Sequence, residues 1–140
     1  MNYIWKSVLA THEEAQPLAG GPWLGDTFPG VALPCHKARG RWIIVRFGDV
    51  WTCAQVADVG PWCTDDDDYV LGMCMPRAER LKGLPCPRTL ADPDSRATLP
   101  GGHRVGPSNG AGIDLFPYTA HLLHLPIGEN ARVEWRFVDP

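Results

Sequence analysis

Two short phrases, Val56-Ala57-Asp58-Val59-Gly60-Pro61-Trp62 and Asn109-Gly110-Ala111-Gly112-Ile113-Asp114-Leu115-Phe116, decide the fold expected for this chain. In each phrase one aspartate stands among apolar residues and close to a glycine. A carboxylate is costly to bury alone, so an aspartate in an apolar strand needs hydrogen-bond partners, a shifted pKa or a chemical role. Asp58 and Asp114 are therefore either reacting groups or buried acceptors that hold the fold together.

The chain before Asp58 predicts a β-hairpin. Residues 41–47 are rich in strand-forming side chains, Gly48-Asp49 is a two-residue turn signal, and residues 50–59 return as the partner strand. A shorter strand is expected over residues 31–34, where it ends at a proline. Asp58 thus lies at the far end of the hairpin, just before the chain breaks at Gly60-Pro61.

The chain after Asp114 predicts a helix and a closing strand. Residues 117–125 begin with a proline and are followed by Pro126 and Gly128, which is typical of a short helix. Residues 131–138 alternate between apolar and polar side chains and predict a strand. Its apolar face is Val133, Trp135 and Phe137, or the opposite set if the register slips.

The rest of the chain has weaker patterns. Residues 1–29 are expected to form an extended N-terminal arm, and residues 64–108 a long irregular insert with one or two helical turns near residues 76–81. The 15 glycines and 14 prolines are spread along the 140 residues without a period, which indicates many short strands and tight turns. We therefore expect a mainly β domain over residues 30–140.

The cysteines and the acidic run allow several interpretations. The five cysteines have no CxxC spacing, so a zinc site is not expected and free buried thiols are the simplest expectation. If a disulfide forms, Cys63–Cys74 is the most natural pair, because it would enclose the acidic residues 65–68. Four adjacent carboxylates repel one another and are expected to stay solvated. Calcium binding is the alternative, although the run lacks the glycine and the late glutamate of a calcium-binding loop.

Composition excludes several classes of function. A net charge of −3, without a strong basic cluster, argues against nucleic-acid binding. No apolar run is long enough to span a bilayer, and the first residues lack the pattern of a secretory signal. We therefore expect synthesis in the cytoplasm, with carriage in a virion or export by other machinery as the alternatives.

In its order of elements the chain resembles the double-psi β-barrel. That family is marked by an Asp-x-Gly-Pro phrase after a long strand, an Ile-Asp-Leu phrase, a small helix and a closing strand. Here these are Asp58-Val59-Gly60-Pro61, Ile113-Asp114-Leu115, residues 117–125 and residues 133–138, and the resemblance covers residues 30–138. It implies a six-stranded double-psi β-barrel with one or two short helices and an extended N-terminal arm.

Within that fold the motifs are similar to those of rare-lipoprotein-A type enzymes and membrane-bound lytic transglycosylases of type A, with expansins and some endoglucanases further away. They look closest to uncharacterised bacterial and phage proteins. The resemblance implies that Asp58 is the catalytic acid/base and that Asp114 is a second acidic position, catalytic in some endoglucanases and structural elsewhere. Rare-lipoprotein-A enzymes also carry a catalytic histidine just before a Leu-Pro pair. Here that place is near Gly30, and the nearest histidine, His36, follows the proline.

The chemistry of glycan cleavage gives each candidate residue a role. A lytic transglycosylase needs one carboxyl that is protonated near neutral pH, because a hydroxyl of the sugar itself completes the reaction. Apolar neighbours and Asp114 could raise the pKa of Asp58. In the competing interpretation Asp58 binds the backbone at the psi crossing and Asp114 caps the helix that begins near Pro117. The catalytic candidates are Asp58, Asp114 and His36.

The substrate-binding candidates surround the expected cleft. Trp62 and Tyr69 could stack on sugar rings, although a place in the core is the alternative for both. His103 lies in a glycine-rich loop, and Asn109 opens the second phrase. No cofactor and no metal ligand set are expected.

The resemblance thus predicts a peptidoglycan-acting barrel that either cleaves or binds glycan strands. The alternative is a non-catalytic structural subunit of a virion, a phage tail or another assembly, in which the barrel serves as an interaction module. The expected partners are accordingly a glycan strand or the protein components of such an assembly.

Overall fold

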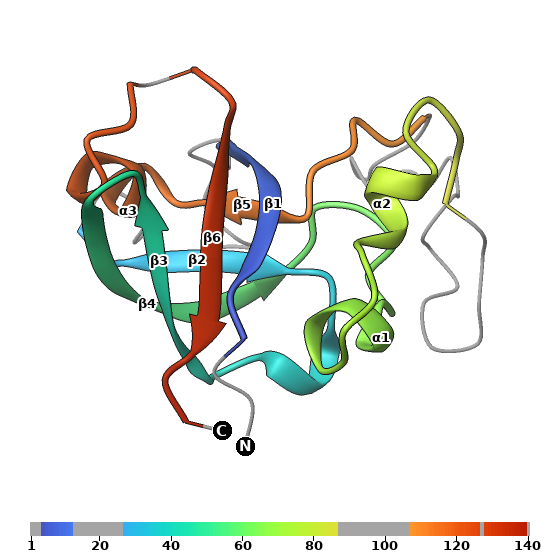
Figure 1. The fold of residues 1–140 in the computed structure, drawn as a ribbon, viewed down its shortest axis with the longest axis horizontal. Coiled ribbons are helices and arrows are strands. Elements are labelled where there is room, and N and C mark those ends of the chain that lie inside the picture. The colour runs from blue at the N-terminus through green and yellow to red at the C-terminus, as the bar shows by residue number, and fades with distance from the viewer. Residues whose placement is uncertain (1–3, 13–26, 87–106, 127, 140) are drawn as a thin grey trace, which may run out of the picture.

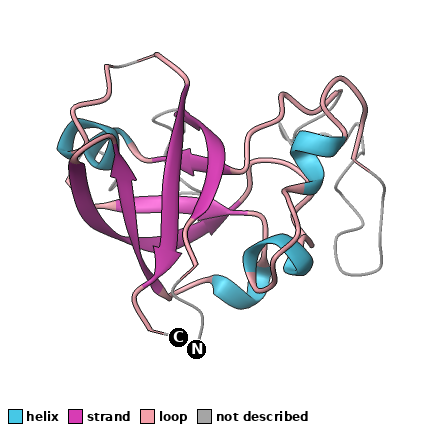
Figure 2. Ribbon diagram, viewed as in Figure 1, coloured by secondary structure: helices cyan, strands magenta, loops and turns pink. Residues whose placement is uncertain are grey.

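The computed structural model describes residues 4–12, 27–86, 107–126 and 128–139. Six strands close into one mixed barrel in the order β1-β5-β2-β4-β3-β6 (Figures 1 and 2). The strands are β1 (Lys6–His12), β2 (Gly30–Leu33), β3 (Trp42–Phe47), β4 (Val50–Val59), β5 (Ile113–Leu115) and β6 (Ala131–Phe137). Two pairs, β1–β5 and β2–β4, are parallel and the other four are antiparallel. The expected mainly β, six-stranded barrel is confirmed.

Short helical segments lie between the strands. They are the 3-10 turn η1 (His36–Ala38) and the helices α1 (Asp67–Val70), α2 (Arg77–Arg80) and α3 (Pro117–Leu122). The short helix expected after Asp114 is confirmed as α3, which starts at its proline. The helical turn expected near residues 76–81 is confirmed as α2. None of the helices in the described ranges is long and apolar enough to cross a membrane.

The hairpin of β3 and β4 forms as its sequence predicts. Gly48 adopts a positive φ of 58° in the two-residue turn, where glycine has no steric penalty. Ile43 pairs with Ala54, and both side chains are fully buried in the core. The alternation of the hairpin residues therefore points one face into the barrel and leaves the other outside.

The expected N-terminal arm does not account for residues 6–12, because they form the barrel strand β1. This strand pairs with β6 on one side and with β5 on the other. Val8 and Ala10 alternate inward and are buried in the core. The physical reason is closure: β1 is the only strand in this order that joins β5 to β6, and without it two strand edges would stay open.

The closing strand β6 buries the apolar face that its alternation predicts. Val133 and Trp135 lie in the core. The Trp135 indole Nε1 donates a hydrogen bond to the Tyr69 hydroxyl at 2.7 Å, and that hydroxyl donates to the carbonyl of Gly112 at 3.0 Å. This buried chain of hydrogen bonds ties α1 and the segment before β5 to the barrel.

The insert is held by a disulfide that differs from the expected pair. Cys63 bonds to Cys86, with their Cα atoms 5.2 Å apart, and the proposed Cys63–Cys74 pair is wrong. The turn at α1 leaves Cys74 exposed, whereas Cys86 is buried beside Cys63 in a small second core with Trp62 and Ala78. The remaining free thiols are buried Cys35 and exposed Cys53 and Cys74.

Candidate functional site

The two aspartates of the sequence phrases lie in one row across the barrel wall. Thr11 of β1 pairs with Asp114 of β5, Asp114 pairs with Ala32 of β2, and Ala32 pairs with Asp58 of β4. Residues in register on neighbouring strands point to the same face of a sheet. Strands lie about 4.8 Å apart, so the Asp58 and Asp114 Cα atoms are separated by roughly 10 Å, with Ala32 between them.

A register shift in β2–β4 brings Asp58 into this row. Val31 pairs with Val56, but the next residue, Ala32, pairs with Asp58, so Ala57 is the extra residue of a bulge. Val31 and Val56 belong to the main core cluster, so Ala32 points away from that cluster, although it is itself buried with 1% of its surface exposed. Bulges commonly re-aim a side chain next to a functional site, and here the bulge aligns Asp58 with Ala32.

Asp58 is partly exposed at the end of β4. Its carboxylate accepts a hydrogen bond from the backbone N–H of Val59 at 2.8 Å. The backbone contact expected for a scaffold aspartate is therefore present. It engages one carboxylate oxygen, and the partial exposure leaves the group accessible from outside the barrel.

Asp114 is buried, with only 1% of its surface exposed. Its carboxylate accepts a hydrogen bond from the Thr11 hydroxyl. The helix-capping role considered for Asp114 is wrong, because the N-cap of α3 is Phe116 and no side chain caps that helix. A buried carboxylate with a hydroxyl donor fits a residue that positions β1 against β5 and places a second carboxyl group near Asp58.

The small second core begins directly after the Asp58 phrase. Trp62 is 8% exposed and packs with the Cys63–Cys86 disulfide and Ala78. A sugar-stacking role for Trp62 does not fit this burial, because stacking needs an exposed ring face.

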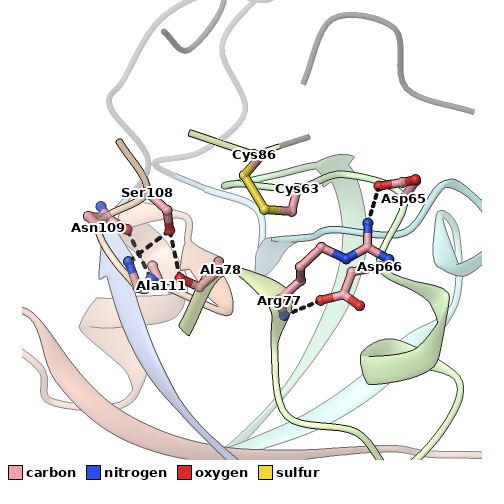
Figure 3. Close-up of a disulfide and its surroundings, with 10 residues drawn as sticks. Cys63, Asp65, Asp66, Arg77, Ala78, Cys86, Ser108, Asn109 and Ala111 are labelled. Atoms are coloured by element: carbon pink, nitrogen blue, oxygen red, sulfur yellow. Dashed lines mark hydrogen bonds and ion pairs between the residues drawn. A yellow bond between two sulfur atoms is a disulfide. The ribbon is translucent and has the colours of Figure 1, made fainter. Parts of the chain in front are cut away.

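Polar contacts lie on either side of the disulfide, and those on one side join the insert to the chain that enters β5 (Figure 3). On one side the Ser108 hydroxyl donates to the carbonyl of Ala78 at 2.8 Å and accepts from the N–H of Gly110 at 3.1 Å. The Asn109 side chain accepts from the N–H of Ala111 at 2.9 Å and so closes a local turn. Asn109 remains exposed at this turn, four residues before β5 begins.

On the other side of the disulfide, Arg77 organises the acidic run (Figure 3). Its guanidinium pairs with Asp65 at 2.9 Å, and its backbone N–H donates to the Asp66 carboxylate at 2.5 Å. Asp66 is buried, so the expected solvated loop is wrong at this residue. Burial raises the pKa of Asp66, and the Arg77 N–H partly offsets the effect.

The other histidine and aromatic candidates lie apart from the row. Tyr69 is 1% exposed and hydrogen-bonded to Trp135, so its ring is a core element and not a sugar-stacking surface. His36 is exposed on η1, beside the Lys37–Asp67 ion pair of 2.9 Å, and makes no hydrogen bond with Asp58. His103 lies outside the described residues.

The environment of Asp67 favours its ionised form, unlike that of Asp66. Hydrogen bonds from Lys37 and from the Cys35 thiol lower the pKa of Asp67, and His36 adds a smaller electrostatic contribution. Within the described parts of the chain no group of three histidine, cysteine, aspartate or glutamate side chains is arranged to hold a metal ion. The carboxylates of Asp65 and Asp66 contact Arg77. The carboxylate of Asp67 contacts Lys37 and Cys35.

The arrangement offers one accessible carboxyl group, Asp58, with a second, buried carboxyl group across Ala32. This combination suits proton transfer by Asp58 to a substrate on the outside of the barrel wall. Thr11, which holds Asp114, could not be found from sequence, because no local pattern reports the register between β1 and β5. No protein-family model matches this chain, and no curated protein shows significant sequence similarity to it.

Proposed function

We propose that this chain is a double-psi barrel that cleaves glycan strands of peptidoglycan by the lytic transglycosylase reaction, with Asp58 as the acid/base. The observation that carries the proposal is the row in which Asp58 and Asp114 flank Ala32. The closed six-stranded barrel with two parallel strand pairs supports the double-psi assignment. The resemblance of the Asp58 and Asp114 phrases supports the choice of substrate.

The reaction needs only one proton-transferring group. Protonated Asp58 donates its proton to the glycosidic oxygen, the bond to the anomeric carbon breaks, and the leaving sugar keeps the proton. The Asp58 carboxylate then accepts a proton from a hydroxyl of the remaining sugar, whose oxygen bonds to the anomeric carbon and closes an anhydro ring. The buried Asp114 is a positioning residue in this scheme, since only 1% of its surface is exposed.

The experiment compares the purified protein with its Asp58→Asn variant on bacterial sacculi, with soluble fragments identified by mass spectrometry. We expect anhydro-sugar products from the wild type and a loss of about 10²–10⁴-fold in the variant, the usual contribution of general acid–base catalysis. Asp49→Asn is the matched control, because Asp49 is an exposed residue of the β3–β4 turn. Full activity in a folded Asp58→Asn variant would refute the assignment.

A second candidate function is an interaction module within a larger assembly. Trp42 and Trp51 lie on the outer face of the β3–β4 hairpin, where they are 42% and 51% exposed. Exposed tryptophans of this kind are typical of binding surfaces. The sacculus experiment separates the two functions, because a protein that neither cleaves nor binds sacculi would favour the interaction module.

A further inference from the structure

A cavity lies at the end of the barrel where β1 begins, on another part of the fold from the Asp58 row. Its volume is ≈ 240 Å³, and its walls are Ile4–Val8, Tyr69 and Met73–Pro76. A neighbouring cavity of ≈ 200 Å³ shares Ile4, Lys6 and Met73 with it. The first cavity is thus formed where the start of β1 meets the segment between α1 and α2.

Among the residues that the structure describes, Lys6 is the one charged side chain that lines the first cavity, whereas Arg41 and Asp139 line the neighbouring cavity. The Lys6 ammonium donates one hydrogen bond, to the carbonyl of Gly72 at 2.9 Å, and lies 5.5 Å from the centre of the Trp135 ring. Within the part of the chain that the structure describes, it forms no ion pair. Partial burial lowers the pKa of Lys6, as expected for an ammonium among apolar groups without a counter-ion.

Several of the side chains around Lys6 are apolar and adaptable. Met73 and Met75 are 74% and 50% exposed, and Ile4 and Pro76 are further apolar residues of the wall. Methionine side chains reshape easily around an apolar ligand. An ammonium beside such side chains favours a ligand that is negative at one end and apolar at the other, whereas a cationic ligand would be repelled.

We infer that this cavity binds a small monocarboxylate with an apolar body. The carboxylate pairs with the Lys6 ammonium, and the apolar body lies against Met73, Met75 and Pro76. The volume suits a short acyl chain, since it is somewhat below the range of drug-sized pockets. The inference is independent of the proposed glycan cleavage.

Alkylation of two exposed thiols can report ligand binding in the cavity of the intact protein. Cys74 lines the cavity, and exposed Cys53 on β4 does not, so it is an internal reference. The protein is alkylated with iodoacetamide in the presence of octanoate, octanol or octylamine, and the rate at each cysteine is followed by mass spectrometry. We expect octanoate to slow alkylation of Cys74 several-fold without affecting Cys53, and octylamine to give no protection.

The variants Lys6→Met and Lys6→Arg test the role of the charge, with octanoate affinity measured by calorimetry. Lys6→Met should weaken binding about tenfold or more, the usual effect of losing one charged hydrogen bond, while Lys6→Arg should keep most of it. Lys37→Met is the matched control, because Lys37 is exposed and pairs with Asp67 outside the cavity. Unprotected Cys74, equal protection by octanoate and octylamine, or a folded Lys6→Met variant with full affinity would each overturn the inference. If Lys6→Met does not fold, the test is Lys6→Arg, and loss of octanoate binding in that variant would overturn the inference.

Discussion

The disulfide between Cys63 and Cys86 should contribute a large part of the stability of this protein. The perturbation is the double substitution Cys63→Ala and Cys86→Ala, which removes the covalent link and leaves the small core of Trp62 and Ala78 otherwise intact. The link joins the end of the Asp58 phrase to the far end of the described insert. Its loss therefore removes the covalent closure of the segment that contains α1 and α2, which keeps its hydrogen bonds to Trp135 and Ser108.

The magnitude follows from the 23-residue separation of the two cysteines. Closing a loop of this size in the unfolded chain removes conformational entropy that corresponds to about 3.4 kcal/mol at 25 °C. For a domain of this length a loss of that size lowers the melting temperature by roughly 10–15 °C. This is a substantial fraction of the 5–15 kcal/mol that typical domains have in total.

The assay is urea unfolding followed by tryptophan fluorescence, with the wild type measured in oxidising and in reducing buffer. We expect the reduced wild type and the double variant to unfold at the same, lower urea concentration. The matched control is Cys53→Ala with Cys74→Ala, because both residues are exposed free thiols and should shift stability by no more than about 0.5 kcal/mol. The reasoning would be refuted if the free energy of unfolding of the double variant lay within about 1 kcal/mol of that of the oxidised wild type. It would also be refuted if reductant left the unfolding of the wild type unchanged.

Two further predictions concern buried polar groups. Trp135→Phe removes the donor to the Tyr69 hydroxyl and should lower the free energy of unfolding by about 2–4 kcal/mol in urea titrations, whereas exposed Trp42→Phe should change it little. For Asp66, burial raises the pKa above its ordinary value of 3.8, so the folded protein keeps this proton at pH values where the unfolded chain has lost it. This residue should therefore make stability fall as the pH rises from about 3.8 through the raised pKa, and urea titrations at several pH values should show a smaller fall in Asp66→Asn. An unchanged pH profile in that variant would contradict the assignment.

Local sequence patterns predicted the elements that need only their own residues. The hairpin of β3 and β4, the helix α3 and the strand β6 each carry a period or a terminating signal within about ten residues. The buried face of β6 followed from the alternation of Val133 and Trp135. These elements could be predicted because neighbouring residues determine both the backbone preference of a segment and which of its faces is buried.

Long-range pairing decided the remaining parts of the fold. Residues 6–12 have too little pattern to identify a strand, and they become one only because β5 and β6 lie on either side of them. Tyr69 follows four aspartates, a composition typical of a solvated loop, yet it packs against Trp135 from the other end of the chain and is buried. The partner of Cys63 could not be read from spacing, because the turn at α1 determines which thiol faces it.

The candidate site shows the same division. The sequence by itself identified Asp58 and Asp114 as unusual carboxylates and placed each at the end of a strand or before a helix. Only the tertiary structure showed that they flank Ala32, that Thr11 holds the buried Asp114, and that Asp58 alone is accessible. The physical reason is that strand propensity acts within a segment, whereas register and burial arise only when strands distant in sequence close the barrel.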